Sequence, residues 1–250
     1  MKLPVVAGWI ERRVVLNYRV DPDVLAAQLP APLRPRLVRG FGVAGICLIR
    51  LRQVRPRPLP ALMGVASENA AHLVAVEWDG MEGTCFGVHV SRRDTSSPFN
   101  VLTRGRLFPG LQRPARFQVR EWEDGLSVSV ASRDGATRIA LRAAVSPTLS
   151  PSSVFGSVGE AAEFFRPGTL GYSPLGSPSG LEPPEVRTIG WHVEALRPDL
   201  LESSYFDDRG RFPEGSVAFD SALLMRSVPL QARRADRLGA SQPVPRLSPT

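Results

Sequence analysis

The residues of this sequence best suited to chemistry are ionisable side chains beside apolar runs. Glu68 lies in SENAAHLVAV and Asp220 in SVAFDSALLM. Burial raises the pKa of a carboxyl group unless an arginine compensates, so either residue could act as a general acid or base, and a buried ion pair is an equal alternative. Among the histidines, His89 is the first candidate, because it shares one face of an alternating stretch with small residues. His72, four residues after Glu68, is the second.

Two kinds of chemistry are excluded or disfavoured by residue type and spacing. Lys2 is the only lysine beside thirty arginines, so no internal amine exists for a Schiff base or for a P-loop. The three histidines, of which His192 is the last, show no His-x-His or His-Glu-x-x-His spacing. The sequence therefore predicts no metal centre.

A stretch rich in arginine and hydroxyl groups, Ser91 to Pro98, precedes an expected helix. Arg92, Arg93 and the hydroxyls could bind a carboxylate or phosphate at that helix start. Alternatively, Asp94 neutralises one arginine and caps the helix. We take Arg92, Arg93 and the later Arg106 as candidate anion contacts.

The net charge of +7 comes from one segment. Residues 34–57 hold seven arginines and no acidic residue, and removing them leaves 24 basic against 24 acidic residues. Such a segment could follow a nucleic-acid backbone, but it has a single aromatic residue, Phe41, and prolines that exclude a basic helix. An arginine-decorated strand rim is the favoured interpretation.

The pattern of apolar and polar residues predicts a mainly β chain with three short helices, so strands should position most of these groups. Strands are expected at 12–20, 41–54, 70–78, 84–91, 115–122, 125–132, 137–145, 186–196, 200–206 and 216–226. Helices are expected after Asp21-Pro22, after Ser97-Pro98 and after the capping box that begins at Ser157, ending near residues 29, 105 and 165.

Two turn signals and one glycine motif refine this prediction. Asp124-Gly125 and Asp134-Gly135 are typical of hairpin turns. Residues 40–45 match G-x-G-x-x-G, but a strand-like run follows where a dinucleotide site needs a helix. We therefore predict no nucleotide cofactor, and no other cofactor.

Length and composition indicate one domain over residues 1–230 and a disordered basic tail over 231–250. The Pro/Gly/Ser-rich residues 171–184 are typical of a lid or binding loop, although they could simply be mobile. Cys47 and Cys85 are expected to be buried thiols in a reducing compartment. No signal peptide and no run of about 18 apolar residues is found, so we expect a cytoplasmic protein without a membrane partner.

Four blocks carry a resemblance to a known family. They are HVSRRDTSSPFNVLTRGRLFPG (89–110), SENAAHLVAVEWDG (67–80), the FGSVGEAAEFF to LGYS stretch (155–173) and SSYFDDRGRFPEGSVAFDSALLMR (203–226). Together they resemble the YqjF-like bacterial family, a branch of the acetoacetate decarboxylase-like superfamily. The resemblance implies a single closed or conical antiparallel β-barrel with flanking helices and an internal cavity.

The resemblance does not extend to the decarboxylase mechanism. That enzyme uses a Schiff-base lysine with a second lysine, a glutamate and an arginine in the cavity. No lysine is available here, and Glu68 would correspond to the cavity glutamate. Residues 226–231, Arg-Ser-Val-Pro-Leu-Gln, also depart from the family's pattern after the LLMR strand.

These observations favour a β-barrel that binds a small anionic or carbonyl-bearing metabolite through His72, Arg92, Arg93 and Arg106, without Schiff-base chemistry. The alternative is a lysine-independent lyase or hydrolase in which Glu68 or His89 is the general acid or base and an arginine stabilises negative charge. Nucleic-acid binding through residues 34–57 is the least favoured alternative.

Overall fold

A computed structural model describes residues 6–80, 83–102, 111–165, 171–172, 184–188 and 192–234 of the chain. The described part is mainly β, as expected. Its strands are β1 (Val6–Val20), β2 (Arg34–Pro35), β3 (Leu37–Val38), β4 (Phe41–Pro56), β5 (Val65–Gly80), β6 (Gly83–Thr95), β7 (Gln112–Trp122), β8 (Gly125–Ser132), β9 (Arg138–Ser146), β10 (Gly171–Tyr172), β11 (Pro184–Thr188), β12 (Glu194–Ser203) and β13 (Val217–Arg234). The helices are α1 (Pro22–Ala26), α2 (Pro98–Leu102), α3 (Val158–Phe165) and the 3₁₀ turn η1 (Ala61–Met63).

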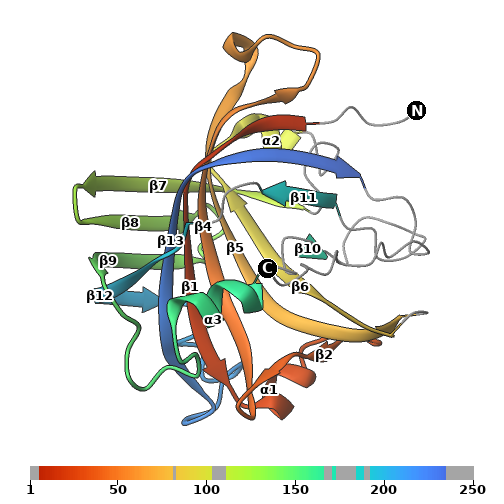
Figure 1. Cartoon of the computed structure of the whole chain (residues 1–250), viewed down its shortest axis with the longest axis vertical. Coiled ribbons are helices and arrows are strands. Elements are labelled where there is room, and N and C mark those ends of the chain that lie inside the picture. Colours follow the sequence, from red (N-terminus) through yellow and green to blue (C-terminus); the bar gives the residue numbers. More distant parts are fainter. Residues whose placement is uncertain are drawn as a thin grey trace, which may run out of the picture.

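The strands form one sheet that bends back on itself. Its order is β10-β6-β7-β8-β9-β12-β13-β1-β4-β5-β2, and β5 also pairs with β6. Nine strands therefore have a hydrogen-bonded neighbour on both sides for part of their length. In Figure 1 the shorter strands β7, β8, β9 and β12 run across the long strands β1, β4, β5 and β13. This arrangement protects backbone groups that an open sheet would leave at its edges.

The main core fills the space between these two groups of strands. Val14 and Leu16 of β1 and Leu48 of β4 pack in one cluster with Val128 of β8 and Leu141 of β9. We call the face of the long strands that carries this cluster the inner face. On the opposite, outer face, Phe164 and Phe165 of α3 pack in a second cluster that includes Val15 of β1 and Leu223 of β13. Because side chains alternate along a strand, each long strand contributes to both clusters.

Local signals in the sequence produce the predicted helix starts and turns. The Asp21 carboxylate accepts a hydrogen bond of 2.9 Å from the Asp23 backbone N–H, and Pro22 occupies the first turn of α1. The Ser157 hydroxyl accepts one of 3.0 Å from the Glu160 N–H at the start of α3. Gly135 adopts a φ of 72° in the turn between β8 and β9. These predictions are confirmed.

The glycine motif at 40–45 leads into strand β4, as the strand-like run after it predicted. Gly40 turns the chain with a φ of 87°, and β4 begins at Phe41. At Gly45 a Cβ atom would lie 2.4 Å from the Leu16 carbonyl oxygen, so only glycine fits there.

Some predicted boundaries were wrong. We expected separate strands at 186–196 and 200–206, but β12 runs unbroken through 194–203 and the chain then turns. Its register with β9 shifts between Pro198 and Leu200, because proline lacks the N–H that the ladder needs. Helix α1 also ends at Ala26 rather than near 29. The strand β13 continues to Arg234, and residues 235–250 of the predicted tail lie outside the described residues.

Candidate functional site

The register of β5 with β6 separates the predicted site residues onto two faces. Ala70 and Val74 of β5 belong to the inner core cluster, and Asp94 and His89 are their partners on β6. His72, opposite Arg92, therefore lies on the inner face, as does Glu68. Arg93 is opposite Ala71, on the outer face. Two neighbouring arginines that we expected to act together thus lie on opposite sides of the sheet.

Glu68 is the centre of an ion-pair cluster. One carboxylate oxygen accepts a hydrogen bond of 2.6 Å from the buried Arg12, and the other accepts one of 3.0 Å from Arg50. Arg12 also pairs with Glu121, and Arg50 with Glu11 at 2.6 Å. Both oxygens of Glu68 are thereby occupied, which is the buried ion pair weighed above as an alternative.

Arg92 is similarly occupied. Its guanidinium donates hydrogen bonds of 2.8 and 2.7 Å to the fully buried Asp94, and further ones to Asp134 in the β8–β9 turn. Burial alone would lower the pKa of Arg92, but these two carboxylates raise it overall. The hydrogen bond from Arg92 is also the main cause of the lowered pKa of Asp134. Arg92 therefore ties β6 to the hairpin turn.

Three ring nitrogens of the two inner-face histidines lack a hydrogen-bond partner among the described residues. His72 is fully buried, its ring lies 4.4 Å from that of Tyr205, and neither ring nitrogen has a hydrogen-bond partner among the described residues. Burial, with smaller effects of Arg92 and Arg211, lowers the pKa of His72 to about 3. The His89 Nδ1 also lacks a partner in this part of the chain, and burial lowers its pKa. Both imidazoles are neutral near pH 7.

On the outer face, Arg93 lies opposite Ala71 and near Cys47. Cys47 belongs to a cluster of four buried side chains on this face, with Leu73, Val88 and Val90. We call Arg93 and this cluster the Arg93 patch, and the four side chains its floor. Within the described ranges, Arg93 makes no hydrogen bond or ion pair, and its Nε is buried. Burial lowers the pKa of its guanidinium to about 10, which still leaves it charged at neutral pH. A cation in an apolar setting without a carboxylate can pair with an anion.

One end of the Arg93 patch is polar, and α2 lies there. Thr95 follows Arg93 on the same face of β6 and donates a hydrogen bond of 2.8 Å to Asn69. The buried Asn100 of α2 donates one of 3.4 Å to the Thr95 hydroxyl. Sequence reasoning did not single out Asn69 and Asn100, although the hydroxyl-rich run before Pro98 marked this region.

Other predicted elements of the site are not brought together with these groups. Asp220 is buried and accepts hydrogen bonds of 2.8 Å from Ser153 and 2.7 Å from the Val154 N–H, so it anchors a loop to β13. Arg106 lies outside the described residues, as does 173–183 of the expected loop. No group of three metal-ligating side chains occurs in the part of the chain that is described.

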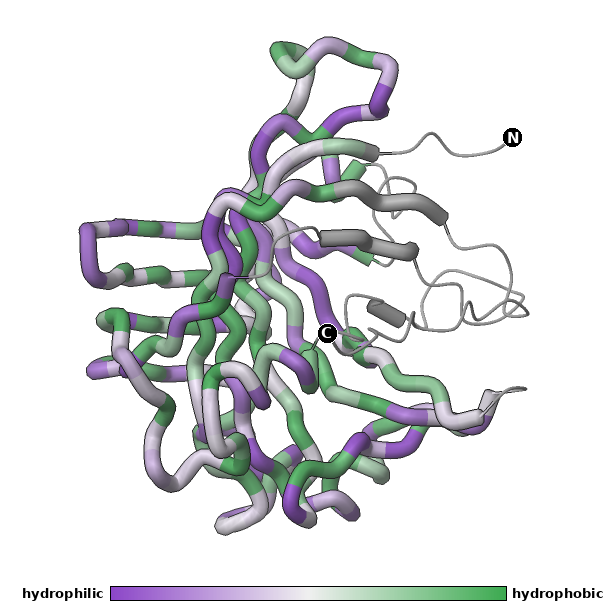
Figure 2. Tube along the Cα trace, in the orientation of Figure 1, coloured by the Kyte–Doolittle hydropathy of each residue, from purple (hydrophilic) through white to green (hydrophobic). Residues whose placement is uncertain are grey.

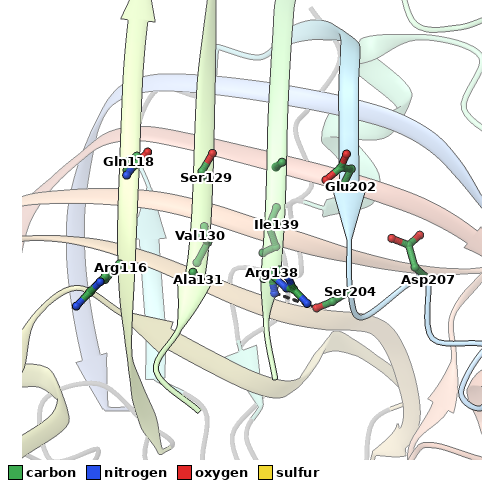
Figure 3. A pocket seen from close by; sticks show the side chains of 11 residues that line it. Arg116, Gln118, Ser129, Val130, Ala131, Arg138, Ile139, Glu202, Ser204 and Asp207 are labelled. Carbon is green, nitrogen blue, oxygen red and sulfur yellow. Dashed lines mark hydrogen bonds between the residues drawn. The ribbon is translucent and has the colours of Figure 1, made fainter. Parts of the chain in front are cut away.

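A hollow of about 600 Å³ opens on the outer surface of β7, β8, β9 and β12 (Figure 3). Its lining includes Arg116, Gln118, Arg138 and Glu202, all exposed. None of the predicted site residues lines it. We therefore place the candidate site on β5 and β6 rather than in this hollow.

Comparison with known proteins agrees with the strand arrangement. No family model and no curated protein sequence matches the chain. Solved structures do: an acetoacetate decarboxylase-like enzyme from Sphingomonas wittichii RW1 matches with 17% identity and a TM-score of 0.59, covering 93% of both chains. The chain has the acetoacetate decarboxylase-like fold.

Two further solved structures, both of enzymes, match the chain over most of its length. The enduracididine biosynthesis enzyme MppR, solved with pyruvate, matches with 14% identity and a TM-score of 0.61, covering 94% of this chain and 91% of its own. Acetoacetate decarboxylase from Legionella pneumophila matches with 12% identity and a TM-score of 0.58, covering 94% of this chain and 88% of its own.

No helix of the described residues is long and apolar enough to cross a membrane.

The arginine-rich segment mostly has partners within the protein. Arg34 pairs with Asp79 at 2.8 Å, and Arg39 lies 3.5 Å from Glu160. Arg36 donates a hydrogen bond of 2.8 Å to the Phe164 carbonyl and lies over the ring of Phe164. These contacts spread the arginines over several elements and favour the strand-rim interpretation over a nucleic-acid site.

Proposed function

We propose that this protein binds a small organic anion, with its carboxylate or similar group on Arg93 and its apolar or carbonyl-bearing part over the floor of the Arg93 patch. The observation that carries the proposal is the unpaired Arg93 guanidinium in an apolar setting. Of the three arginines expected to contact an anion, two are described: Arg92 already holds two carboxylates, and Arg93 holds none in the described structure. An anionic ligand would supply the missing partner.

The energy available to such a ligand is substantial. The fall in the pKa of Arg93 from 12.5 to about 10 corresponds to about 3 kcal/mol that disfavours the charged form. A carboxylate on the guanidinium offsets part of this cost, and part is already offset by the partial exposure of the residue. The apolar floor adds affinity for a ligand body of a few carbon atoms.

Relatives in fold support the class of ligand. MppR has been solved with pyruvate, a small 2-oxo carboxylate of the class that the Arg93 patch fits. Because Lys2 is the only lysine, we propose that binding here proceeds without an imine. His72 and His89 lie on the opposite face of the sheet from Arg93, so they would not contact this ligand directly.

We also propose a family, a barrel shape, domain bounds and a cellular location for this chain. The four sequence blocks support a place in the YqjF-like family, and the nine strands with neighbours on both sides support a conical barrel. We further propose one domain that ends with β13 at Arg234 rather than at residue 230, followed by a tail over 235–250. The free thiols Cys47 and Cys85 support a cytoplasmic location.

A second candidate function rests on the unpaired nitrogens of His72 and His89. Such buried groups call for a polar partner, and a substrate could provide it, with His89 as general base in a lysine-independent lyase or hydrolase. Glu68 is less suited to this role, because arginines occupy both of its oxygens. An activity that falls in His89→Gln, with a pH profile of the residual activity that differs from wild type, would support this candidate.

Thermal-shift measurements with a panel of small carboxylates and ketones test the main proposal. A ligand at one hundred times its Kd stabilises the folded state by about 2.7 kcal/mol, which raises Tm by about 5–10 °C. We expect this shift in wild type and in Arg116→Met, whose arginine is exposed on β7, and its loss in Arg93→Met. Equal stabilisation of Arg93→Met, or no stabilisation of wild type by any carboxylate, would refute the proposal.

A further inference from the structure

The hairpin that joins β4 to β5 projects from the body of the protein and ends in exposed apolar side chains. Figure 1 shows it extending beyond the other elements, and Figure 2 shows hydrophobic residues at its tip. Leu62 is 96% exposed and Met63 62% exposed, and Leu59 and Val65 beside them are exposed as well. Single exposed apolar residues are common, but a group at the end of a projection marks an interaction surface.

Positive charge lies directly behind this tip. Residues 51–67 contain three arginines, Arg52, Arg55 and Arg57, and no acidic residue. Arg52 lies 3.4 Å from Glu11 at the base of the hairpin, whereas Arg57 is exposed and makes no ion pair within the described part of the chain. Trp9, 42% exposed, pairs with Arg52 across β1 and β4. The projection therefore has an apolar end, a cationic middle and an aromatic residue at its base.

The hairpin is held in a defined shape. Arg55 donates hydrogen bonds of 2.9 Å to the Leu59 and Gln53 carbonyl oxygens. Gln53 has a φ of 53°. A Cβ atom on Gly64 would lie 2.5 Å from the backbone of Gln53, so the two arms of the hairpin approach closely there. A shape fixed before binding reduces the entropy that an interaction would cost.

We propose that this hairpin is a peripheral membrane contact, with Leu62 and Met63 inserted at the surface of an anionic lipid bilayer and the arginines at the level of the phosphates. A bilayer has the same layers in the same order: hydrocarbon below, anionic head groups above it and water outside. Trp9 would lie near the interface, where indole rings are favoured. This proposal revises our expectation that the protein has no membrane partner.

Two other occupants fit the hairpin less well. A second copy of the chain, placed tip to tip, would bring like-charged arginines together without acidic residues in the segment to compensate them. Nucleic acid would pair with the arginines but would leave Leu62 and Met63 in water, and no aromatic residue of the tip is available for stacking.

Vesicle sedimentation with the full chain tests the proposal. We expect binding to vesicles of phosphatidylcholine with a quarter phosphatidylglycerol, and at least about tenfold weaker binding of the double variant Leu62→Ser, Met63→Ser. Arg57→Gln should bind about fivefold more weakly. Raising the salt concentration should weaken binding of the wild type, because the arginine contribution is screened.

Matched control variants distinguish binding through the hairpin tip from nonspecific binding of exposed side chains to vesicles. Leu200→Ser and Arg116→Gln remove an exposed leucine and an exposed arginine elsewhere on the sheet and should bind as wild type does. In Leu62→Trp, the fluorescence of the new indole should shift to shorter wavelength when anionic vesicles are added. Circular dichroism and Tm should be unchanged in all variants, since these side chains are exposed.

Three outcomes would overturn the proposal. The first is no binding to anionic vesicles at low salt, and the second is binding that the tip variants leave unchanged. The third is a wild-type dimer in sedimentation velocity that the double variant converts to a monomer, with no vesicle binding, which would assign the tip to a second copy of the chain.

Discussion

Arg93→Met should make the unliganded protein more stable, whereas the same change at the adjacent Arg92 should make it less stable. Arg93 is a charge in apolar surroundings without a partner in the described structure, and the lowered pKa sets an upper limit of about 3 kcal/mol on the cost of keeping it charged. Because the residue keeps partial exposure, we expect a gain of about 1–2 kcal/mol, or about 3–6 °C in Tm.

Arg92 is the matched control because it is the next residue on the same strand and has the opposite surroundings. Its removal leaves the fully buried Asp94 without its cation, and breaking a buried pair in this way costs about 3–5 kcal/mol. Urea unfolding of both variants and the wild type measures the two effects, with an unchanged m-value as the sign that the same unfolding is compared. If Arg93→Met lost as much stability as Arg92→Met, Arg93 would have a partner in the folded protein, and the reasoning that assigns it to a ligand would fail.

Three more predictions concern acid stability, the ion-pair cluster and the excluded chemistry. The pKa of His72 falls from 6.5 to about 3 on folding, so below pH 6.5 the unfolded chain binds the extra proton, and about 2 kcal/mol of stability should be lost between pH 7 and pH 5. Urea unfolding at both pH values should show this loss in the exposed His192→Leu and a loss smaller by that amount in His72→Leu; equal losses would contradict it. Glu68→Gln should lower the unfolding free energy by about 2–4 kcal/mol, because the buried Arg12 loses a charged partner, and a neutral effect in calorimetry would show that the cluster does not need this charge. Borohydride reduction with pyruvate should leave no adduct beyond Lys2 or the amino terminus in peptide mass spectra, and an internal adduct would disprove the exclusion of imine chemistry.

Local signals in the sequence were enough to predict most elements. The cap at Asp21, the capping box at Ser157 and the turn at Gly135 act within a few residues of one another, so their chemistry does not depend on the rest of the chain. The separate strand at 200–206 was predicted wrongly. Strand β12 stays paired with β9 on both sides of Pro198, and β9 is a partner strand far away in sequence.

The candidate site could be predicted in composition but not in arrangement. The run from Ser91 to Pro98 indicated an anion site, yet which of Arg92 and Arg93 is free depends on Asp134, forty-two residues beyond Arg92. The pairing of Glu68 with Arg12 likewise joins residues fifty-six positions apart.

The sequence by itself predicted a protein without imine chemistry, because Lys2 is its single lysine, and it predicted a mainly β chain from alternation and turn residues. Only the tertiary structure decided how neighbouring side chains are used. Alternation places Arg92 and Arg93 on opposite faces, but Asp134, the second carboxylate that Arg92 contacts, comes from a distant turn, and local spacing does not predict such long-range contacts. The carboxylates on the inner face hold Arg92 in a structural role, and the apolar side chains on the outer face leave Arg93 available for the ligand that we propose.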